Sequence, residues 1–218
     1  MSSHSAKATT TLPLGPDSIT PVGVDVGSAR YLFAAASPAD GVGGAATVNA
    51  DYAHRLYSEF QSATHRLGTA PDYVDDQDRL GDLVARYWPR LRRALECAAD
   101  QVVGVARAHP RAVVVLEDLS TTPRPLVEAA HGAMAWADYC PAVAQQLLAD
   151  RALDAGLAVA YVPPEYTSQL CHECGTLGDL GGRGCETLTC VNDDCTVGEV
   201  CRDRSAAVTI ARRYHGEA

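Results

Sequence analysis

Lysine is nearly absent from this sequence of 218 residues: Lys7 is the only one, and every other cation is arginine. No apolar run approaches the length that crosses a bilayer. Residues 1–20 are rich in Ser, Thr and Pro and contain no apolar core of the kind found in signal peptides. We therefore expect a cytoplasmic protein without a membrane partner, in which residues 1–20 form a disordered leader.

The net charge of -9 has a recognisable origin, because aspartate outnumbers glutamate and the cations are arginines. This composition is typical of a halophile, in which an acidic surface keeps proteins soluble in concentrated salt. An acidic mesophilic protein from a GC-rich genome is the alternative. Under either interpretation, the charge argues against strong non-specific binding of nucleic acid.

The apolar pattern predicts an α/β fold with a mixed sheet. Strands expected at residues 21–26, 30–35 and 45–49 form an antiparallel meander, and two wholly apolar runs, 112–116 and 158–162, are typical of buried strands. Helices are expected at residues 52–67, 78–88, 90–109, 141–155 and 204–215. Pro89 is expected to interrupt the second helix or to open the third. The segment 119–140 gives no clear pattern.

Three acidic residues follow or interrupt apolar core segments. Asp25 lies between Val24 and Val26, Glu117 ends the run VVVLE, and Asp203 stands at the start of the last helix. Ionised carboxylates in such places are costly unless they are paired or bound to a metal. The three can converge at one sheet edge, where hard oxygen ligands suit Mg²⁺ or Mn²⁺.

Each acid also has a simpler interpretation. Asp25 can cap a turn, Asp118 can be the inward-facing acid in place of Glu117, and Asp203 can be a helix N-cap. Because the run before Glu117 is wholly apolar, it shows no alternation of apolar and polar residues that would tell whether Glu117 or Asp118 faces inward. The order of the acids on successive core elements is what favours a shared site.

Six of the eight cysteines lie between residues 171 and 201, which favours metal binding over disulfides in a chain with no secretion signal. Cys171 and Cys174 form a CxxC knuckle, and Cys190 and Cys195 form a second, looser pair. Two such pairs are typical of a zinc ribbon, in which four thiolates hold one structural Zn²⁺. Cys185 and Cys201 remain possible competitors, and His172 is expected to face solvent.

Four segments resemble the C-terminal half of TnpB, the insertion-sequence protein akin to type V CRISPR effector nucleases. GVDVGSA at residues 23–29 resembles its first RuvC motif and VVVLEDLS at 113–120 its second. PPEYTSQLCHECG at 163–175 resembles the signature that leads into the first zinc pair. Residues 190–211 resemble the second zinc pair running into the third RuvC motif, with a cysteine spacing like that of haloarchaeal members.

The resemblance implies an RNase H-like (RuvC) mixed sheet flanked by helices, with an inserted zinc ribbon. The nuclease domain would comprise residues 21–165 and 201–218, and the ribbon residues 166–200. It further implies divalent-metal cleavage of DNA, guided by RNA made from the transposon end. The catalytic positions fall on Asp25, Glu117 and Asp203, which would bind Mg²⁺ or Mn²⁺. The zinc ligands fall on Cys171, Cys174, Cys190 and Cys195.

Two departures from the family pattern stand out, and the first of them bears on guide binding. Family members carry a long N-terminal region that holds the guide RNA, and here about twenty residues precede the first strand; we expect an N-terminally truncated member. The third motif has Ser205 where the family has Asn. A transposon-associated endonuclease acting alone or with a partner chain is therefore the first hypothesis. A non-catalytic nucleic-acid-binding remnant and a guide-independent nuclease like the RuvC resolvases are the alternatives.

Overall fold

The computed structural model describes residues 19–68, 77–131, 134–184 and 186–216. The expected leader, residues 1–20, therefore lies almost entirely outside the described residues, as does Cys185. The strands are β1 (Thr20–Val26), β2 (Tyr31–Ala36), β3 (Ala46–Asn49), β4 (Ala112–Glu117), β5 (Ala158–Val162), β6 (Asp179–Gly181), β7 (Thr187–Thr189) and β8 (Glu199–Cys201). The helices are α1 (Gly41–Gly44), α2 (Asp51–Gly68), α3 (Gln77–Arg107), α4 (Leu126–His131), α5 (Trp136–Asp154) and α6 (Arg202–Arg213).

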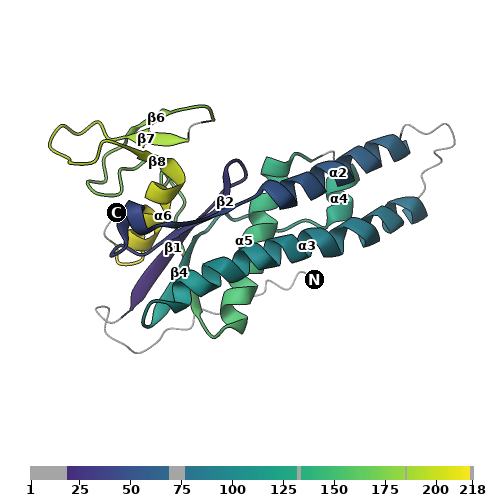
Figure 1. Ribbon diagram of the computed structural model, residues 1–218, viewed down its shortest axis with the longest axis horizontal. Coiled ribbons are helices and arrows are strands. Elements are labelled where there is room, and N and C mark those ends of the chain that lie inside the picture. The colour runs from purple at the N-terminus through teal and green to yellow at the C-terminus, as the bar shows by residue number, and fades with distance from the viewer. Residues whose placement is uncertain (1–18, 69–76, 132–133, 185, 217–218) are drawn as a thin grey trace.

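The main sheet is mixed and has the strand order β3-β2-β1-β4-β5. The meander β1-β2-β3 is antiparallel, as the sequence predicts, whereas β4 pairs in parallel with both β1 and β5. The strand β2 therefore runs opposite to the other four. A second, three-stranded antiparallel sheet, β6-β7-β8, lies beyond α6 at one end of the molecule (Figure 1).

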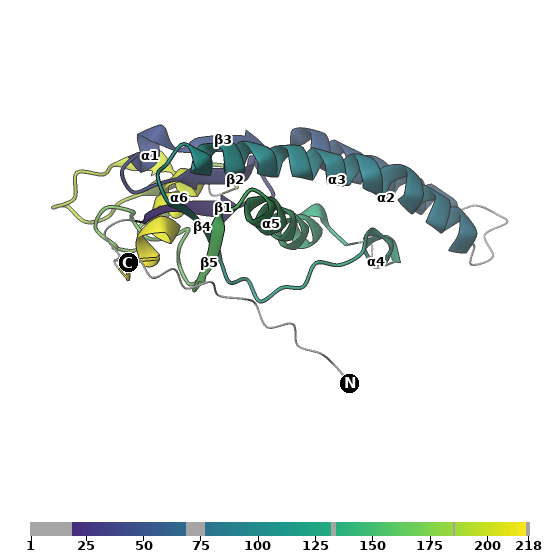
Figure 2. The ribbon, with the colours of Figure 1, turned by 90° about the horizontal axis from the view of Figure 1, so that it is seen from below.

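Helices cover both faces of the main sheet. Val22 and Val24 of β1 pack into a large core with residues of α2, α3 and α5, whereas Ala34 of β2 and Val113 of β4 pack against α6. The helices α2 and α3 continue beyond the sheet as an antiparallel pair (Figures 1 and 2). Within the described ranges, no helix is both long enough and apolar enough to span a bilayer.

Two prolines lie inside helices, which corrects the sequence-based boundaries. Helix α3 continues through Pro89 without a break, and α5 begins at Trp136 instead of Pro141. A proline removes one hydrogen bond to the carbonyl four residues earlier. Those carbonyls belong here to Ala85 and Ala137, both exposed, so water can replace the lost donors. Burial of the apolar side chains around each proline then favours a continuous helix.

Gly23 brings α6 into close contact with β1. A Cβ at this position would overlap the Ala207 carbonyl and the Ala211 amide nitrogen, and would lie 3.0 Å from the Ala211 Cα. All these atoms belong to the backbone of α6, so rotation of a side chain cannot relieve the overlap. The backbone of α6 therefore rests directly on β1.

Gly23→Ala is expected to lower the free energy of unfolding by about 1–3 kcal/mol or more, because α6 must move away from the sheet. Gly104→Ala is a matched control in α3, where a Cβ meets nothing within 4 Å. It should raise the stability by about 0.5–1 kcal/mol, since alanine restricts the unfolded chain more than glycine. Urea unfolding of both variants measures the two effects. Equal stability of both variants would contradict the close packing at Gly23.

Candidate metal centres

Asp25 and Glu117 lie at the same level on neighbouring parallel strands. The register pairs Val22 of β1 with Val114 of β4, and Gly23 with Val115. Continued by two residues, it sets Asp25 opposite Glu117, and adjacent strands are about 4.8 Å apart. Residues at matching levels of parallel strands point to the same face of the sheet. The two carboxylates therefore project together from the ends of β1 and β4.

The face from which they project is the one that α6 covers. Gly23, two residues before Asp25, faces Ala207, and Asp203 lies one helical turn before Ala207. The first turn of α6 thus carries Asp203 to the level of Asp25. Asp203 is not the N-cap residue, which is Cys201.

The three carboxylates interact electrostatically. Burial raises the pKa of Asp25 well above its ordinary value, and the charges of Asp203 and Glu117 raise it further. Asp25 and Asp203 are only 7% and 8% exposed. Arg202 offsets part of this charge, because its guanidinium donates two hydrogen bonds, of 2.9 and 3.1 Å, to one carboxylate oxygen of Asp203. Among the described residues, no side chain donates a hydrogen bond to Asp25.

Glu117 and its neighbour Asp118 point in different directions. The Glu117 carboxylate accepts a hydrogen bond from the hydroxyl of Thr167 and is half-buried. Asp118 is exposed, and its carboxylate accepts a hydrogen bond from the Ser120 amide at 3.3 Å. Burial raises the pKa of Glu117, and the Thr167 hydroxyl lowers it. The structure thus groups Glu117, and not Asp118, with Asp25.

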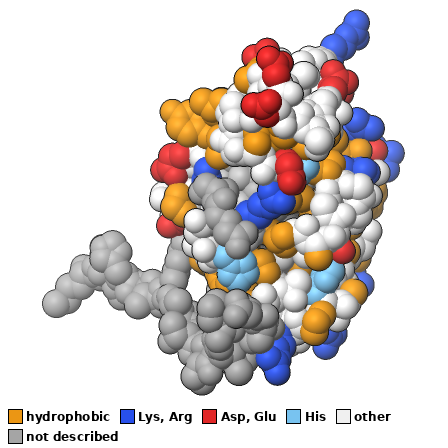
Figure 3. Space-filling view, turned by 90° about the vertical axis from the view of Figure 1, so that its left-hand side faces the viewer, with side chains coloured by type: hydrophobic (Ala, Val, Ile, Leu, Met, Phe, Trp, Pro, Cys, Tyr) orange, Lys and Arg blue, Asp and Glu red, His pale blue; other side chains and the backbone are white. Residues whose placement is uncertain are grey.

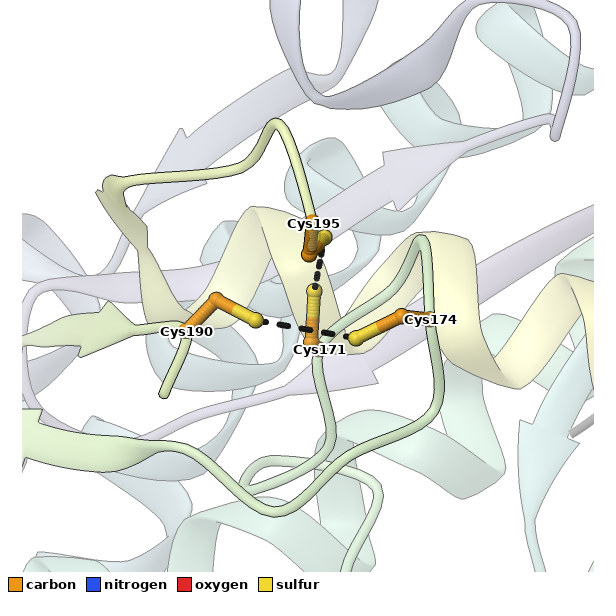
Figure 4. Close-up of side chains that lie close together, drawn as sticks. All are labelled: Cys171, Cys174, Cys190 and Cys195. Carbon is orange, nitrogen blue, oxygen red and sulfur yellow. Dashed lines mark hydrogen bonds between the residues drawn. The ribbon is translucent and has the colours of Figure 1, made fainter. Parts of the chain in front are cut away.

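The four cysteines of the two pairs form a compact cluster (Figure 4). Their sulfur atoms all lie within 4.8 Å of one another. The Sγ atoms of Cys171 and Cys195 are 3.8 Å apart, and those of Cys174 and Cys190 are 3.6 Å apart. Four sulfurs at about 2.3 Å from one tetrahedral Zn²⁺ lie roughly 3.8 Å from each other, so the cluster fits this ion. Cys201, the N-cap residue of α6, stands outside the cluster.

The thiols of the cluster differ in how readily they ionise: the pKa values of Cys190 and Cys195 are raised, that of Cys190 to about 12. Hydrogen bonds from the side chain and backbone of Thr176 lower the pKa of the Cys174 thiol to about 6. The thiolate is the form that binds metals. The positions of the four sulfur atoms show that the cluster can hold a metal ion, as the sequence predicts.

The cysteine knuckle packs against α6, the helix that carries Asp203. The Nδ1 atom of His172 lies 3.1 Å from the Ser205 hydroxyl, and Arg212 contacts the His172 carbonyl and the Glu173 carboxylate. The expectation that His172 faces solvent is therefore wrong: its ring is half-buried, and burial lowers its pKa. The reason is that α6 supplies a polar surface for the knuckle.

In Figure 3, acidic side chains gather over the upper part of this end of the molecule, with cationic ones beside them.

The region from α5 to α6 corresponds to a known domain family. Residues 143–210 match the family described as Cas12f1-like, TNB domain. The match includes the four-cysteine cluster and Asp203, and covers less than half of the chain. No curated protein matches the sequence.

Two solved structures share the fold. The structure of a Cas12f1–sgRNA–target DNA complex aligns with a TM-score of 0.66 at 15% identity, covering 94% of this chain and 52% of that one. A CRISPR-Cas12f ternary complex aligns with a TM-score of 0.63 at 16% identity, covering 88% of this chain and 38% of that one. This chain therefore spans about half or less of the length of the structures it matches. At such identities the likeness concerns the fold alone.

Sequence reasoning singled out the acids and cysteines but missed three residues around them. These are Thr167, which contacts Glu117, Arg202, which contacts Asp203, and Arg213, which holds the loop that carries Thr167. Thr167 lies in the segment that resembles the TnpB signature, and this was its one available signal. The two arginines gave none, because their partners are backbone carbonyls or an adjacent residue.

Proposed function

We propose that this chain is a divalent-metal-dependent DNA endonuclease of the RuvC type, related to the TnpB and Cas12f nucleases. The observation that carries the proposal is the meeting of Asp25, Glu117 and Asp203 from β1, β4 and α6 on one face of the sheet. The strand order, with β2 running against the other four, fits an RNase H-like fold. The likeness to Cas12f supports the same fold.

The acid cluster suits hard divalent cations. It is buried and rich in negative charge, so a cation of two positive charges would relieve the repulsion that raises the pKa of Asp25. Asp25, Glu117 and Asp203 would hold Mg²⁺ or Mn²⁺. When bound as a pair, such ions activate water and stabilise the leaving oxygen in phosphodiester hydrolysis. Arg202, beside Asp203, supplies a fixed positive charge at the rim of the cluster.

In this proposal the four-cysteine cluster binds a structural metal ion, whereas the acid cluster binds the catalytic ions. Its thiolates leave no open position on a tetrahedral ion, so Zn²⁺ there is structural. The ribbon, residues 166–200, is inserted between β5 and α6 of the nuclease domain, residues 21–165 and 201–218. Because the knuckle contacts Ser205 and Arg212, a folded ribbon would help to hold α6 and Asp203 in place.

Catalysis is favoured over a purely binding role by the electrostatics of the acids. A remnant that only binds nucleic acid gains nothing from three carboxylates on a buried face, since these repel phosphates. The test of the proposed function is cleavage of supercoiled and single-stranded DNA by the purified chain in Mg²⁺ or Mn²⁺, compared with EDTA. Absence of metal-dependent cleavage on all substrates would favour the binding module.

We further expect the 218-residue chain, assayed by itself, not to retain a guide RNA. RNA-guided nucleases hold their heteroduplex in a positively charged channel, whereas this chain has a net charge of -9. In the described part of the chain, exposed arginines gather on α3: Arg86, Arg90, Arg92 and Arg93. Arg90 and Arg93 line a cleft of about 700 Å³ beside Tyr52. So few phosphate contacts would give only weak binding, which a high salt concentration abolishes.

Sequencing of RNA that co-purifies with the chain tests this expectation. The result expected is a non-specific mixture that is lost in a wash at high salt. One defined RNA species that survives the wash would contradict it and would support the RNA-guided activity of the family for this chain. Cleavage by the chain alone is then expected to be weak and independent of a guide.

A further inference from the structure

The carboxylate of Glu117 has a hydrogen-bond partner that differs from those of the other two acids. Asp203 is contacted by a charged side chain, that of Arg202, and Asp25 receives no hydrogen bond from a described side chain. Glu117 accepts a hydrogen bond from a neutral hydroxyl, that of Thr167, which stands fifty positions further along the chain. Such a bond fixes the direction of a carboxylate without neutralising its charge.

The geometry determines which way the Thr167 hydroxyl donates. It has one proton and two acceptors within reach, the Glu117 carboxylate and the Pro164 carbonyl, which lies 3.2 Å away. An ionised carboxylate is a stronger acceptor than a backbone carbonyl, so the hydroxyl donates to Glu117. Thr167 is only 2% exposed, so water cannot readily take the place of its hydroxyl.

The loop that carries Thr167 is held firmly on both sides. The guanidinium of Arg213 donates hydrogen bonds of 2.6 Å to the carbonyls of Pro163 and Glu165. Tyr166 adopts a φ of 60°, in the left-handed region that non-glycine residues rarely enter. Such a conformation persists when the surrounding contacts over-determine it. The Tyr166 carbonyl is fixed as well, because it accepts hydrogen bonds from the amides of Gln169 and Leu170, at 2.8 and 2.9 Å.

We propose that Thr167 is a positioning residue for Glu117: its hydroxyl orients the carboxylate toward the divalent ions of the acid cluster. This inference rests on the proposed function. The loop between β5 and the cysteine knuckle thereby becomes part of the metal site, although none of its residues is an expected ligand. A role confined to the loop, through the Pro164 carbonyl, is the competing explanation, and it leaves metal binding unchanged when the hydroxyl is removed.

Direct titration with Mn²⁺, followed by the electron paramagnetic resonance signal of the free ion, tests the proposal without requiring cleavage. Thr167→Val removes the hydroxyl and keeps the shape, and Thr167→Ser restores the hydroxyl. Thr209→Val is a matched control, because Thr209 is equally buried and its hydroxyl contacts only the Ser205 carbonyl among the described residues. Thr167→Ala is measured alongside, so that a folding defect specific to valine does not decide the result.

Loss of a residue that orients a metal ligand typically weakens metal binding about 10- to 100-fold. We expect this loss for Thr167→Val and Thr167→Ala, and binding close to that of the wild type for Thr167→Ser and Thr209→Val. Wild-type binding by both hydroxyl-free variants would overturn the inference and leave the proposed function standing. Wild-type protein that binds no more Mn²⁺ than Asp25→Asn would overturn the proposed function, and the inference with it.

Discussion

Asp25→Asn is expected to lower Mg²⁺-dependent DNA cleavage by about 10³-fold or more and to stabilise the metal-free protein. The loss of activity follows because a missing ligand forfeits several kcal/mol of stabilisation by the metal ions. The gain in stability follows because burial, together with the charges of Asp203 and Glu117, disfavours an ionised Asp25. A gain of about 1 kcal/mol would raise the Tm by roughly 2–4 °C. A cleavage assay and calorimetry in EDTA measure the two effects.

Asp118→Asn is the matched control for this experiment. Asp118 is exposed, adjoins Glu117 in sequence, and its carboxylate accepts a hydrogen bond from the Ser120 amide, so its loss should leave cleavage within about twofold of the wild type. Loss of cleavage together with a higher Tm in Asp25→Asn would identify Asp25 as a functional acid, because the loss of a structural acid would lower the Tm. Cleavage retained in Asp25→Asn, or a lower Tm in EDTA, would rule out the role given to this residue.

Cys171→Ser is expected to remove the metal of the four-cysteine cluster and to unfold the ribbon. Purified wild-type protein should contain about one zinc per chain, because the sulfur positions suit one tetrahedral ion. Cys171 is the most buried of the four cysteines, at 1% exposed, so its loss is expected to disrupt packing as well as any metal coordination. Metal binding and folding are coupled in such small modules, whose apparent zinc affinities reach about 10–16 kcal/mol.

The damage is expected to be local. The ribbon is peripheral to the main sheet, so residues 171–201 should gain rapid hydrogen exchange while β1 and β4 remain protected. Cys97→Ser, at an exposed position on α3, is the control and should keep both the zinc and the protection. Metal analysis and hydrogen exchange give the two readouts. A wild-type protein that is folded, reduced and free of zinc would refute the assignment.

Much of the fold follows from simple patterns in the sequence. The wholly apolar runs predicted the parallel strands β4 and β5, and the meander β1-β2-β3 was expected from short β-rich runs with turn residues between them. The expected burial of both parallel strands is correct for β4 and wrong for β5: β5 lies at the edge of the sheet, and its residues other than Val162 are half-buried or exposed. The other errors fall at proline and in polar segments. Helix α3 continues through Pro89 because tertiary packing outweighs one lost hydrogen bond. The ribbon strands β6, β7 and β8 are too short to show a period.

The candidate site was predictable in part for a similar reason. A carboxylate inside or directly after an apolar strand stands out locally, and so does a CxxC pair. The choice between Glu117 and Asp118 needed the register of β4 against β1, which no local pattern contains. The contact between Thr167 and Glu117 could not be predicted either, because it depends on how the chain returns to the edge of the sheet after β5. Contacts that depend on tertiary geometry therefore had to come from the structure.

We propose that Asp25, Glu117 and Asp203 together hold the divalent ions with which the chain cuts DNA. A crystal of the wild-type chain grown with Mn²⁺ tests it most directly, through an anomalous difference map collected at the manganese edge. We expect manganese peaks between the three carboxylates, with at least one oxygen of each acid within about 2.0–2.6 Å of an ion. A map with manganese only elsewhere, or with none on these three residues at saturating Mn²⁺, would contradict it.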